Sequence, residues 1–296
     1  MTKFFAFAAG AIALVAAPLT AQRNFDEVEI TAEQVAPGIA VLFGAGGNIG
    51  VSYGEDGTVL IDDQFAPLTA KIEAAIAALG AQPVDYVINT HWHGDHTGGN
   101  ENLGEKGALI FAHHNVRARL ADGREGENPI APAAKAALPV VTYGQGVSMH
   151  LNGYRTDVMF VGGGHTDGDS VVMWHGANVV HMGDLYFNIP GFPFMDTSSG
   201  GNVIDAMNSL DAVIRMIDDQ TVVIPGHGPV SNKSELVAYR TMIGQAVDRV
   251  RALMGEGMSL EQAVATQPLA SFDRGEGFID ADGFAGAIYR SLEARD

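Results

Sequence analysis

The sequence predicts an α/β (α+β) protein in which two mixed β-sheets pack face to face, with helices on the outside. Short apolar runs of β type fall into two blocks along the 296 residues, and helical patterns follow each block. The 37 glycines favour a loop-rich α/β chain over a helical bundle, and the 47% hydrophobic residues indicate a folded, globular protein. Because no repeat or low-complexity linker interrupts residues 22–296, we expect them to form a single domain.

The first block contains short strands separated by glycine-rich turns. We expect a helix over Pro67–Leu79, after the third strand, and another helix from about Asn115. Residues 121–147 mix Gly, Pro and polar residues around a short apolar run, which indicates a loop with one interrupted helix. The strands expected in this block are Ile39–Phe43, Gly50–Tyr53, Thr58–Ile61, Tyr86–Asn89 and Leu109–Ala112.

The second block begins after this loop and ends in helices. Apolar residues between Val203 and Ile217 fall on one helical face, and Asn202 is a suitable N-cap for that helix. Further helices are expected from about Ser234, from about Leu260 and near Asp280–Leu292. The strands expected in this block are Val147–Leu151, Thr156–Val161, Ser170–Trp174, Asn178–Met182 and Thr221–Ile224.

Residues 1–21 have the pattern of a secretory signal peptide. Lys3 precedes the apolar stretch Phe4–Ala17, which is short for a transmembrane span, and small residues then allow cleavage after Ala17 or Ala21. The alternative is an uncleaved amphipathic or membrane-anchoring helix, but no stop-transfer pattern follows. We therefore expect a periplasmic or secreted protein that has no stable membrane insertion after cleavage.

Charge and cysteine content narrow the partners and the metal ligands. A net charge of −18 disfavours binding to nucleic acid or to an anionic membrane, because phosphates require an excess of Lys and Arg. The chain has no cysteine, which excludes both disulfides and thiolate ligands. Any metal must therefore be held by imidazoles and carboxylates. The sequence leaves the oligomeric state open.

The segment His91–His96 carries the strongest chemical signal. His91 and His93 lie just past an expected strand and are two residues apart, so we expect them to project to the same side. Asp95 and His96 follow where the chain must turn. Three imidazoles and one carboxylate are costly to bury without a metal, whereas with metals they offer two pairs of ligands. The alternative is a solvated polar loop.

Three more candidate ligands each follow a β-type run. His165 comes after Gly162–Gly164, where glycines permit close approach of the backbone. Asp184 closes the run that begins at Val179, and His227 closes the run that begins at Val222. Each of them alone could be a turn residue. Together they supply the His and Asp side chains that two metal sites still require.

These motifs, with Val59–Asp62 and Pro225–Gly228, resemble those of the metallo-β-lactamase superfamily over nearly the whole chain after the signal segment. The resemblance implies an αββα sandwich with two zinc ions at one edge between the sheets. Asp62 matches an early motif Asp that orients the ligands from outside, and Asp63 is the alternative if the register differs by one. In the implied ligand set the first zinc is bound by His91, His93 and His165, the second by Asp95, His96 and His227, and both by the bridging Asp184.

The resemblance also implies hydrolysis of an amide, ester or thioester in a small-molecule substrate. Two cations lower the pKa of a shared water to near neutrality, so that a bridging hydroxide can attack without a Ser, Cys or Lys nucleophile. We expect Asp95 to hydrogen-bond this hydroxide and aim it, so Asp95 is the predicted catalytic residue as well as a metal ligand.

The flanking sequence points to two branches of the superfamily. Gly163–Trp174 looks like the corresponding stretch of zinc β-lactamases, which favours the amide of a β-lactam as substrate. However, Asp184 stands where one large group of those lactamases has Cys, and Phe187 replaces the Lys that holds the substrate carboxylate. The alternative is a lactone or thioester hydrolase of glyoxalase-II-like type. A mononuclear iron persulfide dioxygenase is a further alternative, because His and carboxylate suit both metals.

The residues that shape the pocket give weaker signals. The loop Gly44–Asn48 could cover the metals as a flap or could be an ordinary hairpin turn. Five aromatic residues could form an apolar wall, although we favour a packing role for them: Trp92, Tyr186, Phe187, Phe192 and Phe194. The histidines without a motif partner are expected on the surface or in the core: His113, His114, His150, His175 and His181.

Overall fold

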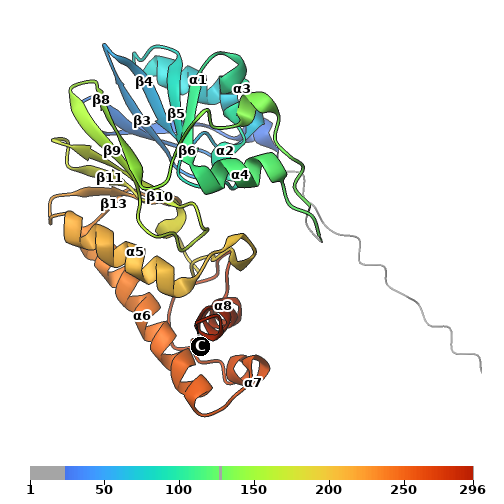
Figure 1. Ribbon diagram of the computed structural model, residues 1–296. Helices are drawn as coiled ribbons and strands as arrows, with labels where there is room; N and C mark the ends of the chain where they lie inside the picture. Colours follow the sequence, from blue (N-terminus) through green and yellow to red (C-terminus); the bar gives the residue numbers. More distant parts are fainter. Residues whose placement is uncertain (1–23, 127–128, 296) are drawn as a thin grey trace, which may run out of the picture.

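Two β-sheets lie face to face in the computed structural model, which describes residues 24–126 and 129–295 (Figure 1). The first sheet has seven strands in chain order. Its strands are β1 (Thr31–Ala36), β2 (Ile39–Phe43), β3 (Ile49–Gly54), β4 (Gly57–Ile61), β5 (Val84–Asn89), β6 (Leu109–His113) and β7 (Val141–Tyr143). The strands from β1 to β4 pair antiparallel and those from β4 to β7 pair parallel, so this sheet is mixed.

The second sheet has six strands and is also mixed. Its strands are β8 (Gly146–Leu151), β9 (Tyr154–Phe160), β10 (Ser170–His175), β11 (Val179–His181), β12 (Val222–Ile224) and β13 (Ser231–Asn232). They are arranged in the order β13-β12-β11-β10-β9-β8, and only β11 and β12 pair parallel.

Helices cover the outer face of each sheet (Figure 1). Over the first sheet lie α1 (Thr69–Ala78), α3 (Asn100–Glu105) and α4 (His114–Asp122), and the single turn α2 (Gly94–Thr97) follows β5. Over the second sheet lie α5 (Val203–Met216) and α6 (Lys233–Gly255), against which α8 (Ala281–Glu293) and α7 (Leu260–Ala265) pack.

Alternation of side chains along the strands builds separate apolar layers. On β4, Val59 and Ile61 pack between the two sheets, whereas Leu60 points to the layer beneath α1. On β10, Val172 and Trp174 join the layer between the sheets. The predicted αββα sandwich is therefore confirmed, because each sheet buries one face against the other sheet and the opposite face against helices.

The differences from the predicted elements fall where the sequence pattern is weak. Strand β1 is not predicted because it is a sheet edge whose first four residues are exposed, so it shows no apolar alternation. The prediction for residues 121–147 is partly wrong, since the described residues of this region include the end of α4, a short 3-10 helix, Lys135–Ala137, and strand β7. The predicted cap of α5 is confirmed, because the Asn202 side chain accepts from Ile204 N–H at 2.9 Å.

The predicted signal peptide, residues 1–21, lies outside the described residues. Within residues 24–126 and 129–295, no helix combines the length and the apolar character needed to cross a membrane. The assignment of residues 22–296 to a single domain stays a prediction.

Candidate metal centre

The predicted ligands lie together at one edge of the sandwich, where strands of both sheets end. The loop after β5 carries His91 and His93, and α2 continues with Asp95 and His96. The second sheet contributes His165 between β9 and β10 and two further side chains that follow β11 and β12. Parallel strands present their carboxyl ends at the same edge, so residues far apart in sequence meet there. The residues brought together are His91, His93, Asp95, His96, His165, Asp184 and His227.

These side chains form two groups. The first group, called the closed group below, consists of His91, His93 and His165; their nitrogens lie within 4.8 Å of one another and of an Asp184 oxygen. His91 and His165 are fully buried. Three imidazoles at this separation can surround a single ion.

The second group, called the open group below, consists of Asp95, His96 and His227, whose ligand atoms also lie within 4.8 Å of one another. Its side chains are more accessible, since Asp95 is 31% exposed and His227 is 22% exposed. Asp184 faces both groups: Oδ1 lies 3.2 Å from His96 Nε2, and Oδ2 lies 3.5 Å from His165 Nε2.

Hydrogen bonds outside the cluster fix the tautomers of two rings of the closed group. His165 Nδ1–H donates to the carbonyl of Phe194 at 2.8 Å, and His93 Nε2–H donates to Asp196 Oδ2 at 2.9 Å. A neutral ring held in this way turns its unprotonated nitrogen inward. These two inward nitrogens, His165 Nε2 and His93 Nδ1, lie only 2.8 Å apart. Two lone pairs that face each other at this distance repel unless a proton or a metal ion binds to them.

Asp62 and Thr90 fix two more rings in the same way. The Thr90 hydroxyl donates to Asp62 Oδ2 at 2.7 Å, so it can only accept from His91 Nδ1–H, at 3.0 Å. His96 Nδ1–H donates to Asp62 Oδ2 at 2.7 Å. Both rings then present Nε2 to the centre of the cluster, which is the arrangement of histidine ligands supported by outer hydrogen bonds.

In the closed group and Asp184 the protonation equilibria agree with a cation-binding role, whereas in the open group Asp184 outweighs burial and raises the pKa of His96 and of His227. Burial lowers the pKa of His91 well below its usual range and lowers the pKa of His165 to about 4, so both rings are neutral at pH 7. Burial opposes ionisation of Asp184, but the surrounding imidazoles, His96 first, hold its pKa well below the usual range. His91 Nε2 and Asp184 Oδ1 are buried and have no hydrogen-bond partner among the described residues. Ionised carboxylate and unpartnered imidazole nitrogens at one point fit a metal ion.

Asp62, rather than Asp63, supports the cluster. Asp62 also accepts from Thr90 N–H at 2.7 Å, and its backbone adopts a left-handed conformation with φ of 64° that these contacts hold in place. Asp63 turns away and accepts from Gly99 N–H at 2.8 Å. Of the two predicted candidates, Asp62 is therefore the one whose side chain contacts the cluster, and Asp63 is not.

The loop Gly44–Asn48 is an anchored turn rather than a free flap. Asn48 N–H donates to the carbonyl of Gly226 at 2.7 Å, and the Gln64 side chain donates to the carbonyl of Gly47 at 2.7 Å. A side chain at Gly47 would collide with the His96 ring, so only glycine lets the turn lie against the open group.

Sequence reasoning missed Asp196, which lies in the loop before α5. Besides His93, the carboxylate accepts from the hydroxyl of Ser199 at 2.6 Å and is approached by Arg124 Nη1 at 3.6 Å. Burial would raise its pKa, but the hydrogen bond from His93 and those from Ser198 and Ser199 keep it lowered. Asp196 is therefore an ionised partner that orients His93 from outside the cluster.

A cavity of about 590 Å³ opens over both groups, and much of its lining is aromatic. Three of the five predicted aromatic residues line it, namely Phe187, Phe192 and Phe194. The packing role holds for the other two: Trp92 packs on α4, and Tyr186 is bonded to Ser231. The polar and charged residues of the lining are His93, Asp95, Arg124, Asp184, Asp196 and His227.

The remaining histidines that are buried have partners outside the cluster. His181 Nε2–H donates to the carbonyl of Asn48 at 3.1 Å, and His181 Nδ1 accepts from Gly183 N–H at 3.2 Å. His113 stacks on Phe160 with ring centroids 4.3 Å apart. The default interpretation of both as core histidines agrees with these contacts.

Comparison with known proteins identifies the family. The sequence profile described as the metallo-beta-lactamase superfamily matches residues 43–227, which is more than half of the chain. This chain belongs to the metallo-β-lactamase superfamily. The predicted membership is confirmed.

Relatives in the superfamily carry more than one activity in their names. A metallo-beta-lactamase type 2 from Bacillus cereus is 28% identical over 191 residues, which are 61% of this chain and 66% of that protein. A hydroxyacylglutathione hydrolase from Polaromonas sp. is 27% identical over 176 residues, 59% of this chain and 60% of that protein. The chain matches less than two thirds of the length of either relative.

Solved structures of other proteins share the fold. A metallo-beta-lactamase from Pontibacter korlensis superposes with a TM-score of 0.61 at 20% identity, covering 73% of this chain and 99% of that chain. A stereoselective inverting sec-alkylsulfatase from Pseudomonas sp. superposes with a TM-score of 0.68 at 17% identity, covering 88% of this chain and 50% of that chain. The likeness at these identities shows the sandwich alone.

Proposed function

We propose that this chain is a dinuclear zinc hydrolase that cleaves a small carbonyl substrate. The observation that supports this most strongly is the set of inward-facing nitrogens, four of them with tautomers fixed from outside, around a carboxylate shared by two groups. In this proposal the closed group holds one zinc ion, the open group holds the other, and Asp184 binds both.

Bound zinc supplies Lewis acidity, which polarises a carbonyl and makes water nucleophilic at neutral pH. The protein's own groups do the rest. Asp95, at the exposed side of the open group, accepts a hydrogen bond from the attacking water and orients it. Asp62 and Asp196 keep the imidazoles in one orientation, so the ligands do not rearrange during a turnover.

The amide of a β-lactam is the substrate we propose first. The relative from Bacillus cereus is named a metallo-β-lactamase, and the cavity of about 590 Å³ is of a size that accepts a small bicyclic molecule. We also propose a periplasmic or secreted location, on the basis of the signal pattern in residues 1–21. N-terminal sequencing of the protein recovered from a periplasmic fraction should start near residue 18 or 22.

A lactone or thioester is the second candidate, and Phe187 is the observation that favours it. This ring stacks on His227 with centroids 5.6 Å apart and planes 5° apart. It stands where the resemblance would require a Lys to hold a lactam carboxylate. The relative from Polaromonas sp., named a hydroxyacylglutathione hydrolase, is consistent with a thioester substrate.

Metal analysis of protein purified without added metal tests the proposed class. We expect about two zinc ions per chain, and one iron with no zinc would overturn the proposal in favour of a dioxygenase. A hydrolysis screen with a penicillin, a carbapenem, an acyl lactone and a glutathione thioester then selects the substrate. Turnover of the thioester alone would reject the β-lactam proposal while leaving the zinc hydrolase in place.

A further inference from the structure

Phe278 is an apolar side chain that the packing of the protein does not explain. It is 82% exposed, the largest value among the exposed large hydrophobic residues of the described part of the chain. It nevertheless lines the cavity over the metal ligands. An exposed aromatic ring on the wall of a binding cavity indicates contact with a ligand, because leaving it in water gains nothing for the fold.

Successive ring contacts connect the closed group with Phe278. Phe194 lies over His93 with centroids 5.9 Å apart and planes 25° apart. Phe278 meets Phe194 edge to face, at 5.6 Å and 87°. Apolar surface therefore extends without interruption from the ligands to the mouth of the cavity.

The backbone that carries Phe278 is held in place by the opposite loop. Gly191 N–H donates to the carbonyl of Arg274 at 2.8 Å, and Phe192 N–H donates to the carbonyl of Ile279 at 2.9 Å. The Arg274 guanidinium returns two hydrogen bonds, to the carbonyls of Gly191 at 2.9 Å and Ile189 at 3.2 Å. The exposed ring is therefore presented on a positioned segment, which reduces the entropy lost when a ligand binds.

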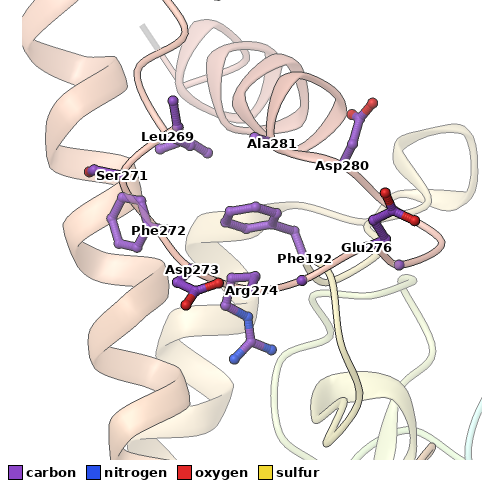
Figure 2. Close-up of a pocket in the computed structure, with 12 residues that line it drawn as sticks. Phe192, Leu269, Ser271, Phe272, Asp273, Arg274, Glu276, Asp280 and Ala281 are labelled. Carbon is purple, nitrogen blue, oxygen red and sulfur yellow. The ribbon is translucent and has the colours of Figure 1, made fainter.

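Figure 2 shows how the segment 269–281 encloses Phe192. This ring lines a second cavity, formed with that segment, as well as the cavity over the metal ligands. The Phe192 ring lies in the middle of the side chains of this segment, with its centroid 6.3 Å from that of Phe272. The segment follows His227 in sequence and lies beyond residues 43–227, which the superfamily profile matches. The wall made by Phe278 therefore lies outside the part of the chain that the superfamily profile matches.

Each charged side chain that lines the cavity already interacts with the ligand groups or with residues next to them. Asp95 and Asp184 belong to the ligand groups, and Asp196 is bonded to His93. Arg124 lies against Asp196 and within 3.3 Å of Ser198 Oγ. The remaining lining residues are apolar: Ala45, Phe65, Phe187, Ile189, Pro190, Phe192, Phe194 and Phe278, with Gly94.

We propose that Phe278 is a specificity-determining residue, and that the site selects substrates with an aromatic or alkyl group attached to the carbonyl side of the molecule. This inference rests on the proposed hydrolase function. The apolar group of the substrate lies against Phe278 and Phe194, while the bond to be cleaved lies over the two ligand groups.

Matched substrates test the proposal through turnover. Benzylpenicillin and 6-aminopenicillanic acid share one β-lactam nucleus and differ in the phenylacetyl group. We expect Phe278→Ala to lower kcat/KM about 10-fold for benzylpenicillin, the loss of one aromatic contact with its buried area, and to change it less than about 2-fold for 6-aminopenicillanic acid. Phe278→Leu should recover part of the loss. Val140→Ala, at an exposed position (64%) outside the cavity, is the control.

Binding tests the proposal independently of turnover. Calorimetry with the zinc-loaded protein should show phenylacetate binding about 10-fold more tightly than acetate, with the preference lost in Phe278→Ala. If neither penicillin is hydrolysed but this preference and its loss are observed, β-lactam hydrolysis fails and the inference on Phe278 stands. If the two carboxylates bind equally, or if Phe278→Ala affects both penicillins alike, the inference is overturned. A change of oligomeric state in Phe278→Ala without a change in preference would also overturn it and assign the ring to a subunit contact.

Discussion

The closed group and the open group share Asp184 but differ in how firmly the protein holds them. All three imidazoles of the closed group are bonded on their outer side, to Thr90, Asp196 and a backbone carbonyl. Among the residues that the structure describes, His96 is the one member of the open group with such a partner, namely Asp62. The closed group is also buried more deeply than Asp95 and His227.

This difference suggests separate roles for the two groups: firmly held ligands suit tight metal binding, and accessible ligands suit substrate binding. Ligands that are already oriented lose little freedom when an ion binds, so the closed group should bind its zinc more tightly. Ligands with open sides leave coordination positions and space for the substrate. Substrate is therefore expected to bind on the side of the open group, whose Asp95 and His227 both line the cavity.

Removal of the shared carboxylate should have the largest effect. Asp184→Asn keeps the shape of the side chain but removes the charge that faces both groups. We expect the zinc content to fall below two per chain, and kcat/KM to fall by more than the roughly 100-fold that loss of an outer partner costs. Asp211→Asn, which alters a carboxylate paired with Arg240 away from the cluster, is the control. Unchanged metal content and turnover would show that Asp184 is not shared.

Removal of one imidazole from each group tests the comparison directly. Zinc titration of the metal-free protein should show a tight step and a weaker step. His227→Ala should keep the tight step and lose the weaker one, because the closed group is intact. His165→Ala should lose the tight step. The comparison is wrong if the two variants behave in the opposite way, or if both lose the same step.

Asp196→Asn should have a smaller effect that is confined to the closed group. An amide can still accept from His93 Nε2–H, but it lacks the charge that raises the basicity of the imidazole. We expect zinc affinity at the tight step to fall about 10- to 100-fold, with no change at the weaker step. Asp211→Asn again serves as the control. An equal loss at both steps would mean that Asp196 stabilises the cavity as a whole rather than His93.

The sequence was sufficient to predict that the candidate ligands lie together, because several of them directly follow runs of β type. His91, Asp184 and His227 each follow a buried run of β type, and such runs end at the same edge of a sheet. These runs also underlie the prediction of the sandwich, because Val59 and Ile61 pack on one face of the sheet and Leu60 packs on the other.

The outer support of the ligands could not be predicted in full. Asp196 lies 103 residues from His93, and its local sequence, Asp196-Thr197-Ser198-Ser199, is that of an ordinary turn. The carboxylate does cap that turn, by accepting from Ser198 N–H at 3.1 Å. A side chain that satisfies a local motif gives no sign of a second partner, so only the folded chain reveals the contact with His93.

The smallest expected effect concerns the stability of the metal-free protein. It compares a substitution next to the closed group with a substitution in the open group. Thr90→Val leaves His91 Nδ1–H without its buried hydrogen-bond partner and removes one of the hydrogen bonds that Asp62 accepts, which should lower the free energy of unfolding by about 1–3 kcal/mol. The Asp95 side chain lies no closer than 3.5 Å to His227 Nε2 and is partly exposed, so Asp95→Asn should change that free energy by less than about 0.5 kcal/mol.

Urea denaturation in the presence of a strong chelator measures both values without a contribution from zinc. Repetition with saturating zinc then tests the role of Asp95, because zinc binding should stabilise the Asp95→Asn variant less than the unmodified protein. If Asp95→Asn destabilises the metal-free protein as much as Thr90→Val does, the Asp95 carboxylate supports the fold itself. The open group would then be held as firmly as the closed group. The two groups would differ only in how far their side chains are exposed to solvent.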